Sequence, residues 1–225
     1  YAWCDAKLPD ANVYLLPSIN GCYVMQRENY LELIRRVEEG ATLYVSNDDG
    51  ILAQFEQLTG LRVTDACLEN ESGTLILGGN SLAFERTRRY ETESVGAKVL
   101  ATDNRGLPII SEYKKGKGKV IYVNFPLEAN LIMRSDAFSS NEHLIYRTIF
   151  RDVIESHVVC SDSPLGITIH EDGEGNITVA AVNYTYETVA PDFKIADGYK
   201  LGEVIYGNVD SIGAFDAVIF KLAKA

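Results

Sequence analysis

The sequence predicts an α/β domain built on a parallel sheet with added β hairpins, followed by a small antiparallel β-sandwich. Three observations indicate this fold class. Over residues 1–60, short apolar runs alternate with amphipathic helical stretches, as in strand–helix–strand units. From Leu61 the pattern changes to strands, with one longer helix after them. From about Gly166 onward, short strand-like runs are separated by clusters of Gly, Asp and Asn, with almost no helical periodicity.

The first 60 residues predict two strand–helix pairs. Asn12–Leu16 is a short apolar run closed by a proline, which is typical of a buried strand. Met25–Glu39 has apolar residues at helical spacing and ends before a glycine, a common helix stop. The same order repeats in strand Ala41–Ser46 and a second short helix, Gly50–Thr59. Because the connections are short, we expect the two strands to lie parallel with a right-handed crossover.

The remaining elements are mostly strands. Six are predicted before residue 125, and the last two form a hairpin with Gly116 and Gly118 in its turn: Leu61–Cys67, Thr74–Leu77, Leu82–Arg88, Lys98–Asp103, Pro108–Lys114 and Lys119–Asn124. A longer helix, roughly Asn141–Ser156, is expected to pack back on the parallel sheet. Five short strands complete the chain: Gly166–His170, Asn176–Asn183, Val189–Ile195, Gly202–Tyr206 and Ala214–Leu222.

A change of charge marks a domain boundary near residue 159. The chain carries 21 Lys and Arg against 32 Asp and Glu, a formal net charge of -11. Residues 1–60 hold 4 basic and 9 acidic residues, residues 61–158 hold 13 of each, and residues 159–225 hold 4 and 10. We therefore expect an α/β domain over residues 1–158 and a β-sandwich domain over residues 159–225.

Composition argues against several classes of function. An acidic chain lacks the cationic surface that nucleic acids and anionic membranes require. No run of the sequence approaches the ~18 apolar residues of a membrane span. The chain opens at Tyr1 without a signal segment, so we expect a processed chain or a piece of a longer one. Its location is unknown from the sequence, with the cytoplasm favoured.

The cysteines and histidines predict neither a metal site nor a disulfide framework. The four cysteines, Cys4, Cys22, Cys67 and Cys160, are scattered, and there are three histidines. A structural zinc site needs paired ligands at short spacing. Four scattered thiols fit a reducing compartment better than a disulfide framework. We therefore predict no metal and no cofactor.

The strongest candidate site is the stretch Ser46, Asn47, Asp48 and Asp49, which follows the second predicted strand. Open α/β sheets bind ligands at the carboxyl ends of their parallel strands. A carboxylate there could orient a sugar hydroxyl or a metal ion. The simpler interpretation is that Asn47 or Asp48 caps the next helix. Both interpretations stay open at the level of the sequence.

Other residues carry weaker signals. Cys22 lies between a strand and a helix, where an activated thiol would lie, but the small residue expected after such a thiol is absent. Glu28, Glu32 and Glu128 are candidate carboxylates for glycoside hydrolysis, yet the sequence places no partner for any of them. The predicted hairpin carries a cluster of lysines, Lys114, Lys115, Lys117 and Lys119. Its simplest interpretation is a soluble turn, and the alternative is a surface that binds an acidic partner.

Aromatic residues offer a further possibility. Trp3, Tyr184 and Tyr186 are the aromatics least easily assigned to a core. Exposed rings of this kind could stack on sugar rings, and a shallow surface platform of two coplanar aromatics would support a carbohydrate-binding module.

Three stretches resemble a known family. Val13-Tyr14-Leu15-Leu16-Pro17-Ser18 and Val37–Ser46, together with Gly116–Pro126, resemble the glutamine-amidotransferase-like domain of multi-domain glycoside hydrolases such as family 42 β-galactosidases. The resemblance covers most of residues 11–225 and implies a flavodoxin/amidotransferase-like parallel sheet. The strands after the α/β domain are similar to the C-terminal sandwich of such enzymes.

The resemblance implies that this chain catalyses no reaction itself. In amidotransferases the strand matching Thr42–Ser46 leads to a cysteine, whereas here Ser46, Asn47 and Asp48 follow. The family domain also begins with a strand and helix that are missing here. We therefore expect a C-terminal piece of a glycosidase, with the catalytic barrel upstream as its partner and a homo-oligomer as a second form of assembly.

Three function classes remain open. The first is this accessory region, with no catalytic residue in the chain. The second is a carbohydrate-binding module that uses exposed aromatic rings. The third is a hydrolase or amidotransferase relative that uses Cys22, which would need a histidine within hydrogen-bond reach.

Overall fold

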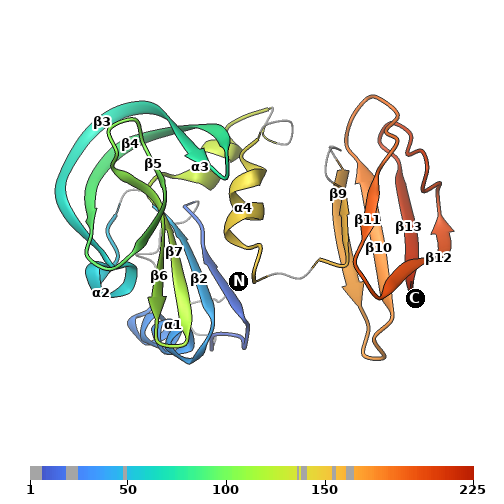
Figure 1. Cartoon of the computed structure of the whole chain (residues 1–225), viewed down its shortest axis with the longest axis horizontal. Coiled ribbons are helices and arrows are strands. Elements are labelled where there is room, and N and C mark those ends of the chain that lie inside the picture. Colours follow the sequence, from blue (N-terminus) through green and yellow to red (C-terminus); the bar gives the residue numbers. More distant parts are fainter. Residues whose placement is uncertain are drawn as a thin grey trace. The chain divides into compact units, whose positions relative to one another are not determined.

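A computed structural model describes residues 7–18, 25–47, 50–135, 137, 141–153, 156–160 and 165–225. Contacts divide the chain into two units, Tyr1–Val153 and Ile154–Ala225. The first unit contains the helices and a mixed sheet, and the second contains strands, with the chain coloured by sequence in Figure 1. An α/β part followed by a β-rich part is therefore confirmed. Each unit is described by itself.

The first unit is built on a five-stranded mixed sheet in the order β1-β2-β7-β6-β5. Its first three strands are parallel, and β6 and β5 are added antiparallel. The strands are β1 (Val13–Leu16), β2 (Thr42–Ser46), β7 (Gly118–Val123), β6 (Pro108–Lys115) and β5 (Lys98–Thr102). The predicted parallel pairing of the first two strands and the hairpin formed by the last two are both present.

Alternating side chains bury the sheet on both faces. Leu43, Val45 and Tyr122 point to one face, where they share a core with α1 (Arg27–Glu39) and α2 (Phe55–Thr59). Tyr44, Ile121 and Val123 point to the other face. They pack there with α4 (His143–Ile149) and with the far end of a long β ribbon. The short helix α3 (Leu127–Ile132) follows β7.

The ribbon consists of β3 (Leu61–Leu77) and β4 (Asn80–Ser94), which pair antiparallel and bend along their length (Figure 1). The sequence predicted a break around residues 68–73, where polar residues and a glycine follow one another. The structure instead absorbs this stretch in a β-bulge between Leu68 and Glu71, so that β3 is continuous. The guanidinium of Arg86 is buried and donates to the backbone oxygen of Asn124, which ties the ribbon to the end of β7.

The helices differ from their predicted bounds. The second helix begins at Phe55 instead of Gly50, because Gln54 has a left-handed φ of 56° that a continuous helix does not allow. The predicted helix Asn141–Ser156 is limited to His143–Ile149 among the described residues, with turns following it. Helix α3 was not predicted, since its six residues are too few for a clear period.

The second unit is two antiparallel sheets around one core. The larger sheet has the order β12-β13-β10-β9, and the smaller one pairs β11 with β8. The strands are β8 (Val158–Cys160), β9 (Leu165–Glu171), β10 (Ile177–Asn183), β11 (Phe193–Ile195), β12 (Tyr199–Tyr206) and β13 (Ala217–Lys224). Val158 and Phe193 pack against Val179 and Phe220 in this core. The predicted boundary at residue 158 falls inside β8.

Candidate functional site

The carboxyl edge of the parallel strands is where an open α/β sheet binds ligands. Strand β2 ends there at Ser46, which is 3% exposed, and the next residue, Asn47, is 4% exposed. The backbone N–H of Asn47 donates to the oxygen of Val123 at 2.8 Å, so the chain continues the sheet past β2. Asp48 and Asp49, the other two predicted site residues, lie outside the described residues, as does Cys22. A ligand role for these residues stays a prediction.

Glu128, in the first turn of α3, connects the strand ends at this edge. Its Oε1 accepts hydrogen bonds from the hydroxyls of Tyr44 and Tyr146, each at 2.6 Å. Its Oε2 accepts a hydrogen bond from the Ser46 hydroxyl. The same oxygen accepts bonds from the backbone N–H and hydroxyl of Ser18, at 3.2 and 3.1 Å. We call these five residues the Glu128 cluster.

Hydrogen-bond donors fill the acceptor positions of the Glu128 carboxylate. A carboxylate offers about four lone-pair sites, and five donor groups already surround this one. Burial acts to raise the pKa of Glu128, but the hydrogen bonds from Ser46, Tyr146, Tyr44 and Ser18 outweigh it and hold the pKa below its usual range. The carboxylate is therefore charged at neutral pH, and every acceptor position on it is filled.

The two tyrosines of the cluster are fixed as donors. Burial, followed by the charge of Glu128, raises the pKa of Tyr44 and that of Tyr146. Both phenols therefore keep their protons over the physiological range. The cluster ties the ends of β1 and β2 to α3 and α4, which is a structural use of a carboxylate.

Part of this cluster could have been found in the sequence. Tyr44 and Ser46 are two residues apart on one strand, so their side chains must share a face. Glu128 was a candidate carboxylate without a partner, because its partners are up to 110 residues away in the chain. Glu32, another candidate, lies on the surface of α1, where hydrogen bonds from Arg35 and then Arg36 lower its pKa to about 2.

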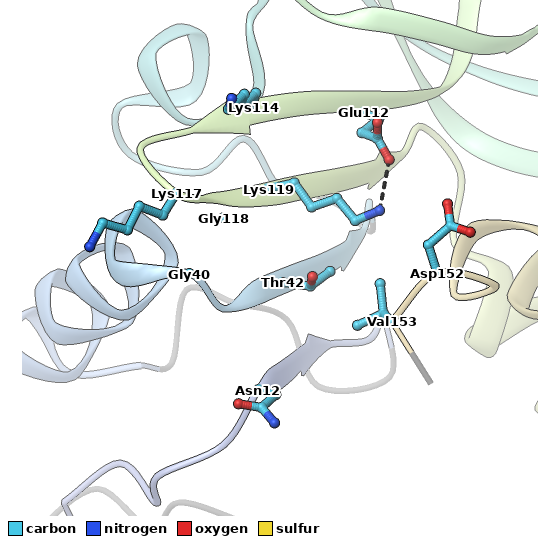
Figure 2. A pocket seen from close by; sticks show the side chains of 10 residues that line it. All are labelled: Asn12, Gly40, Thr42, Glu112, Lys114, Lys117, Gly118, Lys119, Asp152 and Val153. Atoms are coloured by element: carbon cyan, nitrogen blue, oxygen red, sulfur yellow. Dashed lines mark hydrogen bonds and ion pairs between the residues drawn. The ribbon is translucent and has the colours of Figure 1, made fainter. Parts of the chain in front are cut away.

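A hollow lies at the opposite, amino edge of the strands. It has a volume of about 520 Å³ and opens beside Asn12, Thr42 and Lys119, at or near the starts of β1, β2 and β7. Figure 2 shows Lys119 crossing the centre of the hollow towards Glu112, with Asp152 and Val153 facing it.

The lysines of the hairpin differ in where their ammonium groups lie relative to this hollow. The ammonium of Lys119 lies 3.0 Å from Glu112 Oε2, so that charge is neutralised. The ammonium of Lys117 extends outward beside the end of α1 (Figure 2). Lys115 is paired with Glu38. The lining of the hollow therefore combines the Lys119–Glu112 ion pair with further charged side chains, among them Asp152, and with neutral polar groups.

The described residues show neither a metal-binding group nor a membrane-spanning helix. Among them, no group of three or more His, Cys, Asp and Glu could hold a metal ion. No helix in the same part of the chain is long and apolar enough to cross a membrane.

The fold was then compared with those of known proteins. No protein-family model and no curated protein matches the sequence. Solved structures of glycoside hydrolases do match the fold. The β-galactosidase from Rahnella sp. R3 has a TM-score of 0.67 and 14% identity over 95% of this chain and 32% of its own. Gan42B, a GH42 β-galactosidase from G. stearothermophilus, has a TM-score of 0.63 in its E323A catalytic mutant and 15% identity over 97% of this chain and 33% of its own.

A third β-galactosidase matches over similar shares of the two chains. The β-galactosidase from Bacillus circulans sp. alkalophilus gives a TM-score of 0.63 and 17% identity, over 94% of this chain and 33% of its own. The exo-β-1,4-mannosidase Op5Man5 from Opitutaceae bacterium strain TAV5 gives a TM-score of 0.55 and 19% identity, over 69% of this chain and 28% of its own. The chain thus spans about a third of the length of these enzymes. At these identities the likeness is one of fold alone.

Proposed function

We propose that this chain is a non-catalytic accessory region of a glycoside hydrolase, which acts in assembly or in shaping a sugar site completed by another part of the enzyme. The observation that carries the proposal is the match of fold over nearly the whole chain to about a third of several β-galactosidases. A region that makes up a third of an enzyme leaves room for a catalytic domain elsewhere.

The Glu128 cluster supports the non-catalytic part of the proposal. Glycoside hydrolysis uses two carboxyl groups that face each other across the substrate. Glu128 lies at the edge where an α/β sheet would bind its ligand, yet hydroxyl and N–H donors fill its acceptor positions. Ser46 of the same cluster is buried, so its hydroxyl holds a carboxylate and does not face solvent.

A finer proposal concerns the origin of the fold. The α/β unit is an amidotransferase-like domain that keeps the sheet and lacks the reaction, since Ser46 and Asn47 occupy the end of the strand that leads to the thiol in amidotransferases. The upstream barrel and a second copy of the chain are its proposed partners. Sedimentation of the purified chain, with and without a separately produced barrel, tests both forms of assembly.

Hydrolysis of aryl glycosides by the purified chain tests the central proposal. We expect no turnover of nitrophenyl β-galactoside or β-mannoside above the buffer rate. Turnover that persists through successive purification steps would overturn the proposal. A glutaminase assay before and after treatment with iodoacetamide tests the Cys22 hypothesis: an activity lost on alkylation would favour an amidotransferase relative.

A further inference from the structure

Three aromatic side chains lie exposed at one end of the second unit. Tyr186 is 88% exposed, Phe215 is 60% exposed and Tyr206 is 53% exposed. Single exposed rings are common on protein surfaces, whereas exposed apolar side chains that gather in one patch can mark an interaction site. Together with Asp216, which contacts Tyr206, these residues form what we call the aromatic corner.

Direct contacts connect the aromatic corner. The rings of Tyr186 and Phe215 lie 4.7 Å apart between centroids and meet at 87°. The backbone N–H of Phe215 donates to the oxygen of Thr185 at 3.3 Å, which joins the two loops. The hydroxyl of Tyr206 donates to Asp216 Oδ1 at 3.0 Å. The rings of Tyr186 and Phe215 are not coplanar, so they form a right-angled corner instead of a flat platform.

Phe215 has a backbone conformation that a bulky residue rarely adopts. Its φ is +53°, in the left-handed region that glycine prefers. Strain of this kind persists where the surrounding structure imposes it, and often marks a functional position. The ring of Phe215 is largely exposed, so core burial does not explain the strain. The fold therefore holds this residue in an unfavourable conformation and presents its ring to solvent.

The polar groups of the corner indicate the ligand. Asp216 Oδ1 accepts bonds from Tyr206 and from the backbone N–H of Ala217, whereas Oδ2 accepts none within the described residues. A free carboxylate oxygen beside aromatic rings suits a molecule with an apolar face and hydroxyl donors. Residues 159–225 hold 10 acidic and 4 basic residues, which disfavours an anionic ligand.

We propose that the aromatic corner binds a neutral sugar ring of an oligosaccharide. The apolar C–H face of the sugar lies on one ring, the second ring contacts its edge, and a sugar hydroxyl donates to Asp216 Oδ2. The choice of sugars rests on the proposed function, because the solved structures that match the fold include β-galactosidases and an exo-β-1,4-mannosidase. Binding at the corner is nevertheless separate from any hydrolysis by this chain.

Calorimetric and NMR titrations of the full chain test the site. The probes are neutral β-galacto-oligosaccharides of two to four units and a β-1,4-manno-oligosaccharide, each to roughly 20 mM. We expect saturable binding with a Kd of about 1 mM, and amide shifts concentrated at residues 184–187 and 213–217. Tyr186→Ala and Phe215→Gly should each weaken binding by about tenfold or more.

Two variants separate a binding role from a structural one. Phe215→Gly removes the ring and relieves the left-handed strain, so its melting temperature should equal or exceed that of the unaltered chain. Ile205→Ser changes an exposed apolar residue of β12 outside the corner and should leave the affinity unchanged.

Several outcomes would overturn the proposal. These are the absence of binding at the highest concentration, an affinity unaffected by Tyr186→Ala, and a chain that unfolds when Phe215 becomes glycine. Sedimentation adds one more: if Tyr186→Ala dissociates an oligomer and no sugar binds, the corner is a contact between copies of the chain. Aryl glycoside turnover would overturn the proposed function alone and leave a positive binding result standing.

Discussion

Glu128 illustrates how a half-buried carboxylate is stabilised by hydroxyl and backbone donors. Burial disfavours its charge, and the surrounding donors restore the balance without an ion pair in the cluster. Because the donors come from the segment after β1, from β2 and from α4, the carboxylate holds three chain segments in one place. The same donors leave no acceptor position open, which is why we interpret the cluster as structural.

Glu128→Gln should destabilise the first unit by about 2–3 kcal/mol, because the amide nitrogen would face hydroxyl and N–H donors that need an acceptor. Urea unfolding followed by circular dichroism measures the loss. Glu28→Gln, an exposed position on α1, is the matched control and should leave the midpoint unchanged. Equal effects of the two substitutions would contradict a structural role for the Glu128 cluster.

The pKa directions in the cluster predict how stability depends on pH. The lowered pKa of Glu128 contributes stability above the unfolded value of about 4.3, which is lost as the pH falls through the folded value. The raised pKa values of Tyr44 and Tyr146 contribute stability below about pH 10, which is lost as the pH rises further.

Melting temperatures measured from pH 2 to 11 test both limbs of the stability curve, which are the acid limb below about pH 4.3 and the alkaline limb above about pH 10. Glu128→Gln should make the acid limb shallower, and Tyr146→Phe should do the same for the alkaline limb. Unchanged limbs in both variants would show that other groups control the pH dependence.

At the scale of elements, the close approach of the hairpin between β6 and β7 to the end of α1 depends on Gly118 and also on Gly116, where an added Cβ would lie 2.5 Å from the backbone oxygen of Glu38. A Cβ added at Gly118 would lie 2.1 Å from the backbone oxygen of Ala41 and 2.3 Å from that of Val37. The sequence assigned Gly118 to the turn of the hairpin. In the structure its role is to let two backbones meet, whereas Gly116 has the left-handed φ of the turn.

Gly118→Ala should therefore destabilise the first unit by about 3 kcal/mol or more, since backbone atoms must move to admit the methyl group. Gly173→Ala is the control, because nothing lies within 4 Å of a Cβ added there. Chemical unfolding of both variants gives the comparison. A loss in Gly118→Ala no larger than in the control would contradict the packing of β7 against α1.

The sequence predicted best those elements whose apolar residues form a clear local pattern. Strand β2 is a fully buried apolar run, and α1 has an apolar stripe that ends at a glycine. The ribbon was divided in the prediction because a bulge has no local signature and depends on pairing with the other strand. The Glu128 cluster was only partly predictable, since its hydrogen bonds join residues that are distant in the chain.

At the scale of the whole molecule, each unit has a core of its own. One core in the second unit contains Val179 and Phe220, and the first unit has two cores on the faces of its sheet. The charge pattern of the sequence predicts a boundary near residue 159, where acidic residues begin to dominate, whereas the contacts divide the chain after Val153.

Separate cores predict two unfolding transitions in differential scanning calorimetry. Glu128→Gln should lower the transition of the first unit alone, because its hydrogen bonds all lie there. Phe215→Gly should move only the transition of the second unit. A single transition that both substitutions shift together would show instead that the two units unfold as one.

The most direct measurement of the central claim is the rate at which the purified chain hydrolyses a nitrophenyl β-galactoside, compared with a Glu128→Gln variant. We expect both proteins to match the buffer rate across pH 4 to 9. Turnover by the unaltered chain that disappears in the folded variant would contradict it, because Glu128 would then be a catalytic carboxylate.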